Sequence, residues 1–207
     1  MVKPNEALTL DAESLDIHLQ YLYAEPDDWA KYEAAVTSLG WMRTTLLSQL
    51  VSGFMGKHWK YYAECAELEA KSRGISPGQF FEECCADFPS EPPTKANGGP
   101  KYPGWGAKLT PRLDPKSRPL FLPSPLATVV RIEQTNANRQ RVKTLRLGLH
   151  NAALLRVACE VEQCKLIPLV SLILRYHFEQ YWEKAYASQI RAANARSFHR
   201  LFSDPTD

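Results

Sequence analysis

The sequence predicts a mainly α-helical fold with a short β ribbon, organised as two similar units that a proline-rich insertion joins. In each of two segments, 15–62 and 143–182, alternating apolar residues give way to two apolar stripes at helical spacing. Between these segments, residues 86–125 hold ten of the fifteen prolines, and so many prolines disfavour helix or central strand. We therefore expect a first unit at 1–85, an insertion or linker at 86–127 and a second unit at 128–207.

The first segment opens with an expected strand over 15–23. One of its faces carries Leu15, Ile17, Leu19, Tyr21 and Tyr23, and the other carries Asp16, His18, Gln20 and Leu22. A helix is expected over 26–40, because a proline and two acidic residues open it and a glycine closes it. The spacing predicts a second helix over 42–74 and a short one from Pro77.

The second segment repeats this order. Leu145, Leu147 and Leu149 alternate with polar residues or glycine, which predicts a strand that is followed by a helix ending near Cys164. Pro168 suits the first position of another helix, which we expect to continue past Trp182. Residues 128–134 also alternate and predict an extra strand, turned back as a hairpin at 136–138.

The two segments match each other at an offset of 124 residues. This offset pairs Leu46 with Val170, Leu50 with Leu174 and Phe54 with Phe178. A repeat of strand, helix and helix indicates an internally duplicated chain.

The first copy resembles the ribbon-helix-helix family of DNA-binding proteins. Its strand, the helix PDDWAKYEAAVTSLG and the helix MRTTLLSQLV stand where the family has a strand, a helix with a glycine turn and a second helix led by Ser or Thr. The second copy departs from the pattern, with Cys164-Lys165 at the turn and Ile167-Pro168 at the cap. Two copies in one chain are similar to the tandem, TraY-like form, which implies a pseudo-dimer with paired strands and interlocked helices.

The resemblance implies site-specific binding of double-stranded DNA, by a transcriptional regulator or a conjugation or plasmid accessory factor. The paired strands would enter the major groove. The implied base-reading residues are His18, Gln20, Thr144 and Arg146. The implied phosphate contacts are Arg43, Thr44 and Thr45 at the second helix, and Lys143 beside the second strand. The chain would act as a monomeric pseudo-dimer or as a homodimer.

The distribution of charge agrees with a polyanionic partner for the C-terminal half. Residues 1–40 hold two basic and eight acidic side chains, whereas residues 135–200 hold eleven basic and four acidic ones. The sequence has no run of eighteen apolar residues and no secretory signal, so we expect no membrane span and a cytoplasmic location.

Catalysis is not expected. The sequence has no phosphate-binding glycine motif and no hydrolase or metalloprotease motif, and its five histidines are scattered. Its five cysteines lack metal-binding spacing, so we expect free thiols, no metal and no cofactor.

A second hypothesis is a non-catalytic scaffold or adaptor. Tyr102 and Trp105 lie in the proline-rich insertion, and aromatic side chains of extended segments commonly anchor protein partners. This hypothesis predicts docking of a protein or nucleoprotein partner through residues 98–125. It predicts loss of that partner in Trp105→Ala, whereas DNA binding predicts salt sensitivity and loss of affinity in Arg146→Ala.

Overall fold

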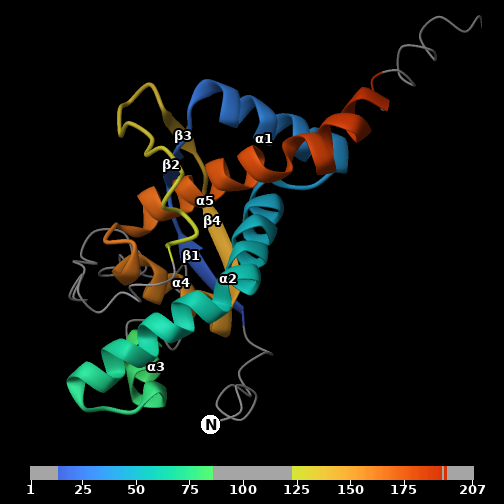
Figure 1. Cartoon of the computed structure of the whole chain (residues 1–207). Helices are drawn as coiled ribbons and strands as arrows, with labels where there is room; N and C mark the ends of the chain where they lie inside the picture. Colours follow the sequence, from blue (N-terminus) through green and yellow to red (C-terminus); the bar gives the residue numbers. More distant parts are fainter. Residues whose placement is uncertain (1–13, 86–122, 193, 195–207) are drawn as a thin grey trace, which may run out of the picture.

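The structure is a computed structural model that describes residues 14–85, 123–192 and 194 (Figure 1). It is mainly helical with a small antiparallel β component, as the sequence predicts. The strands are β1 (Ser14–His18), β2 (Tyr21–Tyr23), β3 (Arg139–Arg141) and β4 (Thr144–Gly148). The helices are α1 (Pro26–Leu39), α2 (Arg43–Arg73), α3 (Pro77–Cys85), α4 (Leu149–Val161) and α5 (Leu166–Tyr181), and the π-helical turn η3 (Trp182–Ala187) follows α5.

The strands pair within one chain. β1 runs antiparallel to β4, with Asp16 opposite Arg146, and β2 runs antiparallel to β3, with Tyr23 opposite Arg139. Both ladders keep one register, and the backbone N–H of Leu19 donates to the carbonyl of Lys143 between them (3.3 Å). The two ladders are therefore the halves of one antiparallel ribbon with an interruption at its centre.

The interruption reverses the faces of the first strand. Gln20 has a positive φ of 64°, which an L-residue adopts mainly in turns and bulges. Ile17 and Leu19 are buried before it, and Leu22 is fully buried after it, while Tyr21 and Tyr23 are only half-buried. The prediction of one uninterrupted strand with Leu22 on the polar face was wrong, because the positive φ of Gln20 turns the chain so that the residues after it face the opposite way, while the register stays the same.

The second half of the chain differs from the predictions at three places. Residues 128–134 form no strand, and the turn that follows leads into β3 instead of closing a hairpin. Leu149 begins α4 rather than ending a strand. Lys165 is the N-cap of α5, so Pro168 is its third residue; proline is tolerated there because N–H groups of the first turn have no intrahelical acceptor.

Matching features recur at a constant offset of 123 residues. Glu25 and Gly148 cap α1 and α4 with the same backbone angles, φ −62° and ψ 152°. After these helices, Gly40 and Gln163 both adopt positive φ, 64° and 52°. The offset of 124 was therefore one residue too long, because it aligned Phe54 with Phe178 by apolar character alone.

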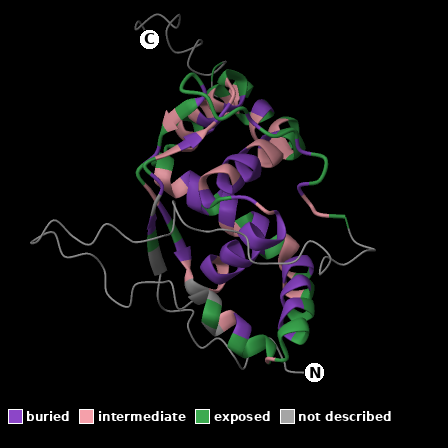
Figure 2. Ribbon diagram, turned by 90° about the vertical axis from the view of Figure 1, so that its left-hand side faces the viewer, coloured by how far each residue is buried: buried purple, intermediate pink, exposed green. Residues whose placement is uncertain are grey.

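Helices α2 and α5 both pack on the ribbon, and each bonds to a strand from the other half of the chain. The Oγ of Ser48 in α2 accepts a hydrogen bond from the backbone N–H of Arg146, and the Oγ of Ser171 in α5 accepts one from that of Tyr23, each at 2.9 Å. Each second helix therefore holds the strand of the other half of the chain. The buried residues, purple in Figure 2, gather in the helices at the centre of the molecule and in the strands beside them.

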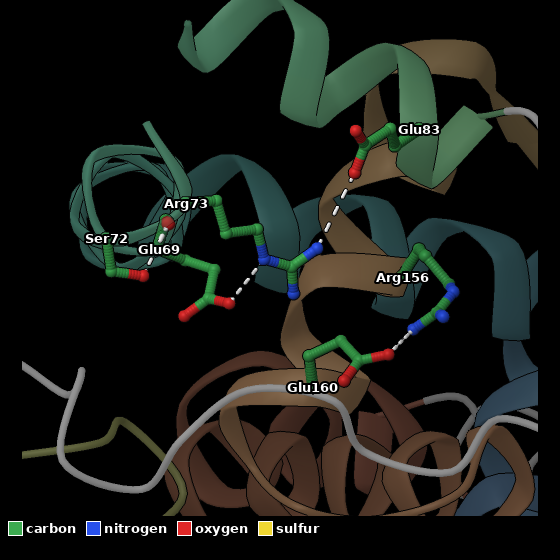
Figure 3. Close-up of polar contacts among 6 residues, drawn as sticks. All are labelled: Glu69, Ser72, Arg73, Glu83, Arg156 and Glu160. Carbon is green, nitrogen blue, oxygen red and sulfur yellow. Dashed lines mark hydrogen bonds and ion pairs between the residues drawn. The ribbon is translucent and has the colours of Figure 1, made fainter. Parts of the chain in front are cut away.

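Two sets of charged side chains lie on α2, α3 and α4 (Figure 3). Arg73 lies 2.6 Å from Glu69 and 3.5 Å from Glu83 of α3. Arg156 pairs with Glu160 one turn later on α4, and each of these side chains is only 5% exposed. The contact of Arg73 with Glu83 ties the far end of the long α2 to α3, whereas the pair of Arg156 and Glu160 lies within α4.

Candidate nucleic-acid interface

One side of the ribbon faces away from the helices, and we call it the outer ribbon face. Leu22, Leu145 and Leu147 point to the other side, where they are buried. The outer ribbon face comprises Asp16, Tyr21, Tyr23, Arg139, Arg141, Thr144 and Arg146, with Gln20 and Lys143 at the central interruption. All four of its basic side chains are exposed, so the face is accessible to a large polar ligand.

The β1·β4 half of this face holds a weak ion pair. Arg146 Nε lies 3.8 Å from Asp16 Oδ1, and these side chains are 70% and 57% exposed. An exposed pair of this kind contributes about 0–1 kcal/mol. The guanidinium of Arg146 can therefore exchange this contact for a ligand at little cost.

The β2·β3 half is organised around a stacked arginine. The guanidinium carbon of Arg139 lies 3.8 Å from the ring centroid of Tyr21, and the Tyr21 ring meets that of Tyr23 edge-on at 5.4 Å. The hydrogen bond that the Tyr23 hydroxyl donates to Tyr21 raises the pKa of Tyr23, and burial raises it further, so this phenol stays neutral. Arg141 is exposed directly opposite Tyr21.

The structure brings most of the predicted base-reading positions together. Arg146 and Thr144 lie in β4, and His18 stands opposite Thr144 in the ribbon. Gln20 is exposed but lies at the interruption rather than in a strand, because its positive φ takes it out of the ladder.

Arg139 and Arg141 were not predicted as contact residues. Both lie in β3, which pairs with β2, whereas the predicted pairing used residues 128–134. The signal was the run Arg139-Gln140-Arg141, a charged residue at every second position. A three-residue alternation is too short to identify a strand until its partner is known.

The residues predicted to contact phosphate differ in exposure and in their contacts within the protein. Arg43 makes a two-point contact with Glu33, at 2.7 Å and 2.9 Å, and this hydrogen bond raises the pKa of Arg43. Thr44 and Thr45 are half-buried in the first turn of α2, whose N-cap is Met42 and has no side-chain cap. Lys143 is exposed beside the ribbon.

Two further predictions lie outside the described residues, namely Tyr102 and Trp105. Within the described residues no group of three or more His, Cys, Asp or Glu side chains could hold a metal ion. Burial raises the pKa of the Cys159 thiol well above its ordinary value, which makes it a poor nucleophile. Among the helices that the structure describes, none is both long and apolar enough to span a membrane.

No family model, curated protein or solved structure matches this chain.

Proposed function

We propose that the chain binds double-stranded DNA through the outer ribbon face. One observation carries the proposal: this face combines four exposed cationic side chains with a single described carboxylate, that of Asp16, while the opposite face is packed on helices. The cations are Arg139, Arg141, Lys143 and Arg146. A two-stranded ribbon fits the major groove of B-DNA, which is roughly 12 Å wide.

We further propose that the fold is a tandem pseudo-dimer of two ribbon-helix-helix-like units. The constant offset between Gly40 and Gln163 and the reciprocal bonds of Ser48 and Ser171 support it. In such a pseudo-dimer the two strands form one ribbon about an approximate two-fold axis, and each second helix packs across it.

Recognition would combine base contacts and phosphate contacts. Arg139, Arg141 and Arg146 have the planar donor geometry that suits O6 and N7 of guanine, while Thr144 suits several bases. Lys143 would contact a phosphate, as would the backbone N–H groups at the start of α2. Arg43 would join them only after exchanging its contact with Glu33. This mechanism holds DNA and involves no catalysis.

The role that fits such binding is a site-specific regulator or a conjugation or plasmid accessory factor. A protein on a defined duplex site can block or recruit other proteins there. The outer ribbon face would supply the specificity, and the helices would hold the ribbon in shape.

Binding to a pool of random duplexes, followed by fluorescence anisotropy at low and moderate salt, tests the proposal. We expect affinity to fall steeply with salt, because neutralised phosphates release counterions. Arg141→Ala should weaken binding to the enriched sequence by about tenfold, and Arg146→Ala should weaken it by a smaller factor. The matched control is Lys71→Ala, which removes an exposed cation at the far end of α2. Absence of binding at low salt, or an equal loss in the control, would overturn the proposal.

The scaffold hypothesis stays a prediction, and it is the alternative if the chain binds no DNA duplex. It would be tested by partner capture with the native chain and with Trp105→Ala, and loss of one defined partner in the variant would support it.

A further inference from the structure

The two strands of the outer ribbon face carry different chemistry at equivalent positions. Residues 123 positions apart occupy equivalent places, as the identical pairing of Tyr23 with Arg139 and of Arg146 with Asp16 illustrates. The equivalent outer pairs are Asp16 and Arg139, Gln20 and Lys143, Tyr21 and Thr144, and Tyr23 and Arg146, while the position equivalent to Arg141 holds His18. Every Lys or Arg of the face therefore comes from the second strand.

The two halves of the face consequently differ in charge. The β2·β3 half holds Arg139 and Arg141 opposite two tyrosines and has no carboxylate among its described residues. In the β1·β4 half, Arg146 stands opposite Asp16 and within 3.8 Å of its carboxylate. A polyanion is therefore attracted more strongly to the β2·β3 half.

Arg139 is also better ordered than an ordinary exposed arginine. Its guanidinium stacks on the Tyr21 ring, which the edge contact with Tyr23 holds in turn. Stacking uses the flat face of the guanidinium, whereas its N–H donors point outward in its plane. Less side-chain entropy is then lost when those donors bind a base edge.

We infer that the DNA site is not a palindrome and that the protein binds it in one orientation. This inference rests on the proposed function. The β2·β3 half contacts the stronger half-site, which contains the guanines that Arg139 and Arg141 bind. The β1·β4 half contacts a different and weaker half-site, because Asp16 stands where the stronger half has Arg139. A symmetric ribbon would instead present the same side chains to both half-sites.

Selection from a random duplex pool with the native chain tests the inference directly. We expect an enriched sequence whose two half-sites differ. Two synthetic duplexes, each a palindrome of one half-site, should then differ in affinity by about tenfold or more, with the duplex built from the weaker half-site binding less well. The asymmetric duplex should bind better than that weaker palindrome.

Three variants assign the half-sites to the two ends of the ribbon. Arg139→Ala and Arg141→Ala should lose the preference for particular bases at the stronger half-site. Arg146→Ala should lose less affinity, and its base preference should change only at the weaker half-site. Circular dichroism of each variant separates a folding defect from a binding defect. If the native chain selects a palindrome, or the three variants lose affinity equally, the inference is wrong while DNA binding stands. If no duplex binds at low salt, the proposed function itself fails.

Discussion

Ser48 of α2 and Ser171 of α5 make the same kind of hydrogen bond to the ribbon. Each accepts a backbone N–H of the ribbon at 2.9 Å, Ser48 from Arg146 and Ser171 from Tyr23. Each helix is thereby tied to a strand from the other half of the chain, so the two halves stabilise each other.

Replacing either serine by alanine should destabilise the fold. Ser48 and Ser171 are 9% and 1% exposed, so each substitution leaves a partly buried ribbon N–H without its acceptor, which costs about 1–3 kcal/mol. Urea unfolding measures the change in the free energy of unfolding. Ser52→Ala, at a half-buried position of the same α2, is the control and should change stability by less than about 0.5 kcal/mol. Serine variants as stable as the control would show that these bonds contribute little.

Two glycine substitutions should have opposite effects. Gly40→Ala places a side chain at a φ of 64° and should cost about 1 kcal/mol, although the new methyl group would meet no atom within 4 Å. Gly56→Ala lies in the interior of α2, also with nothing within 4 Å, and should stabilise by about 0.5–1 kcal/mol. Thermal unfolding of both variants checks the signs, and a shift in the same direction for both would contradict the backbone argument.

His177 should make stability fall as the pH falls below 6.5. Burial lowers the pKa of His177 from 6.5 to about 4, and its Nε2 lies 2.9 Å from the Tyr186 hydroxyl. Between these values the unfolded chain binds a proton that the folded chain does not, so stability is full above pH 6.5 and is lost toward pH 4.

The difference between the native chain and His177→Gln isolates this contribution, because other groups titrate in both. Urea unfolding at pH 7, 5.5 and 4.5 should show a steeper decline for the native chain over that range. Parallel pH profiles would mean that His177 is protonated equally in both states.

The buried ion pair should depend on both of its partners. Arg156→Ala removes the guanidinium that pairs with the buried Glu160 and should cost about 3–5 kcal/mol. The double variant Arg156→Met with Glu160→Leu should recover most of that loss, because neither side chain is then charged. Lys31→Ala, which breaks an exposed pair with Asp27, is the matched control and should cost less than about 1 kcal/mol.

Lys143 should contribute to affinity but not to sequence preference. If it contacts a phosphate, Lys143→Ala lowers the slope of log affinity against log salt by about one and weakens binding to all duplexes alike. Anisotropy titrations at several salt concentrations measure the slope. Lys71→Ala removes the same charge far from the ribbon and should leave the slope unchanged. A change in sequence preference instead would assign Lys143 to a base.

The helices were predictable because their signals are local. Pro26, Gly40 and Gly74 mark helix ends through their own backbone preferences, and the structure confirms all three. The ribbon was predictable only in part. The positive φ of Gln20 depends on pairing with residues far along the chain, and no local residue signals it.

The candidate site was likewise predictable only in part. Arg146 and Thr144 lie in a five-residue strand whose alternation is plain, whereas Arg139 and Arg141 lie in a three-residue strand that only its partner defines. The engagement of Arg43 by Glu33 joins different helices, so the sequence pattern could not reveal it.

The pairing of β1 with β4 has a consequence for how the chain folds. During synthesis the first strand has no partner until residue 148 has been made, so its edge stays exposed throughout that time. Contacts so distant in sequence also form slowly, because a long loop must close first. A second chain at high concentration can supply the missing strand with the same hydrogen bonds, so exchange of halves between chains is the expected route to misassembly.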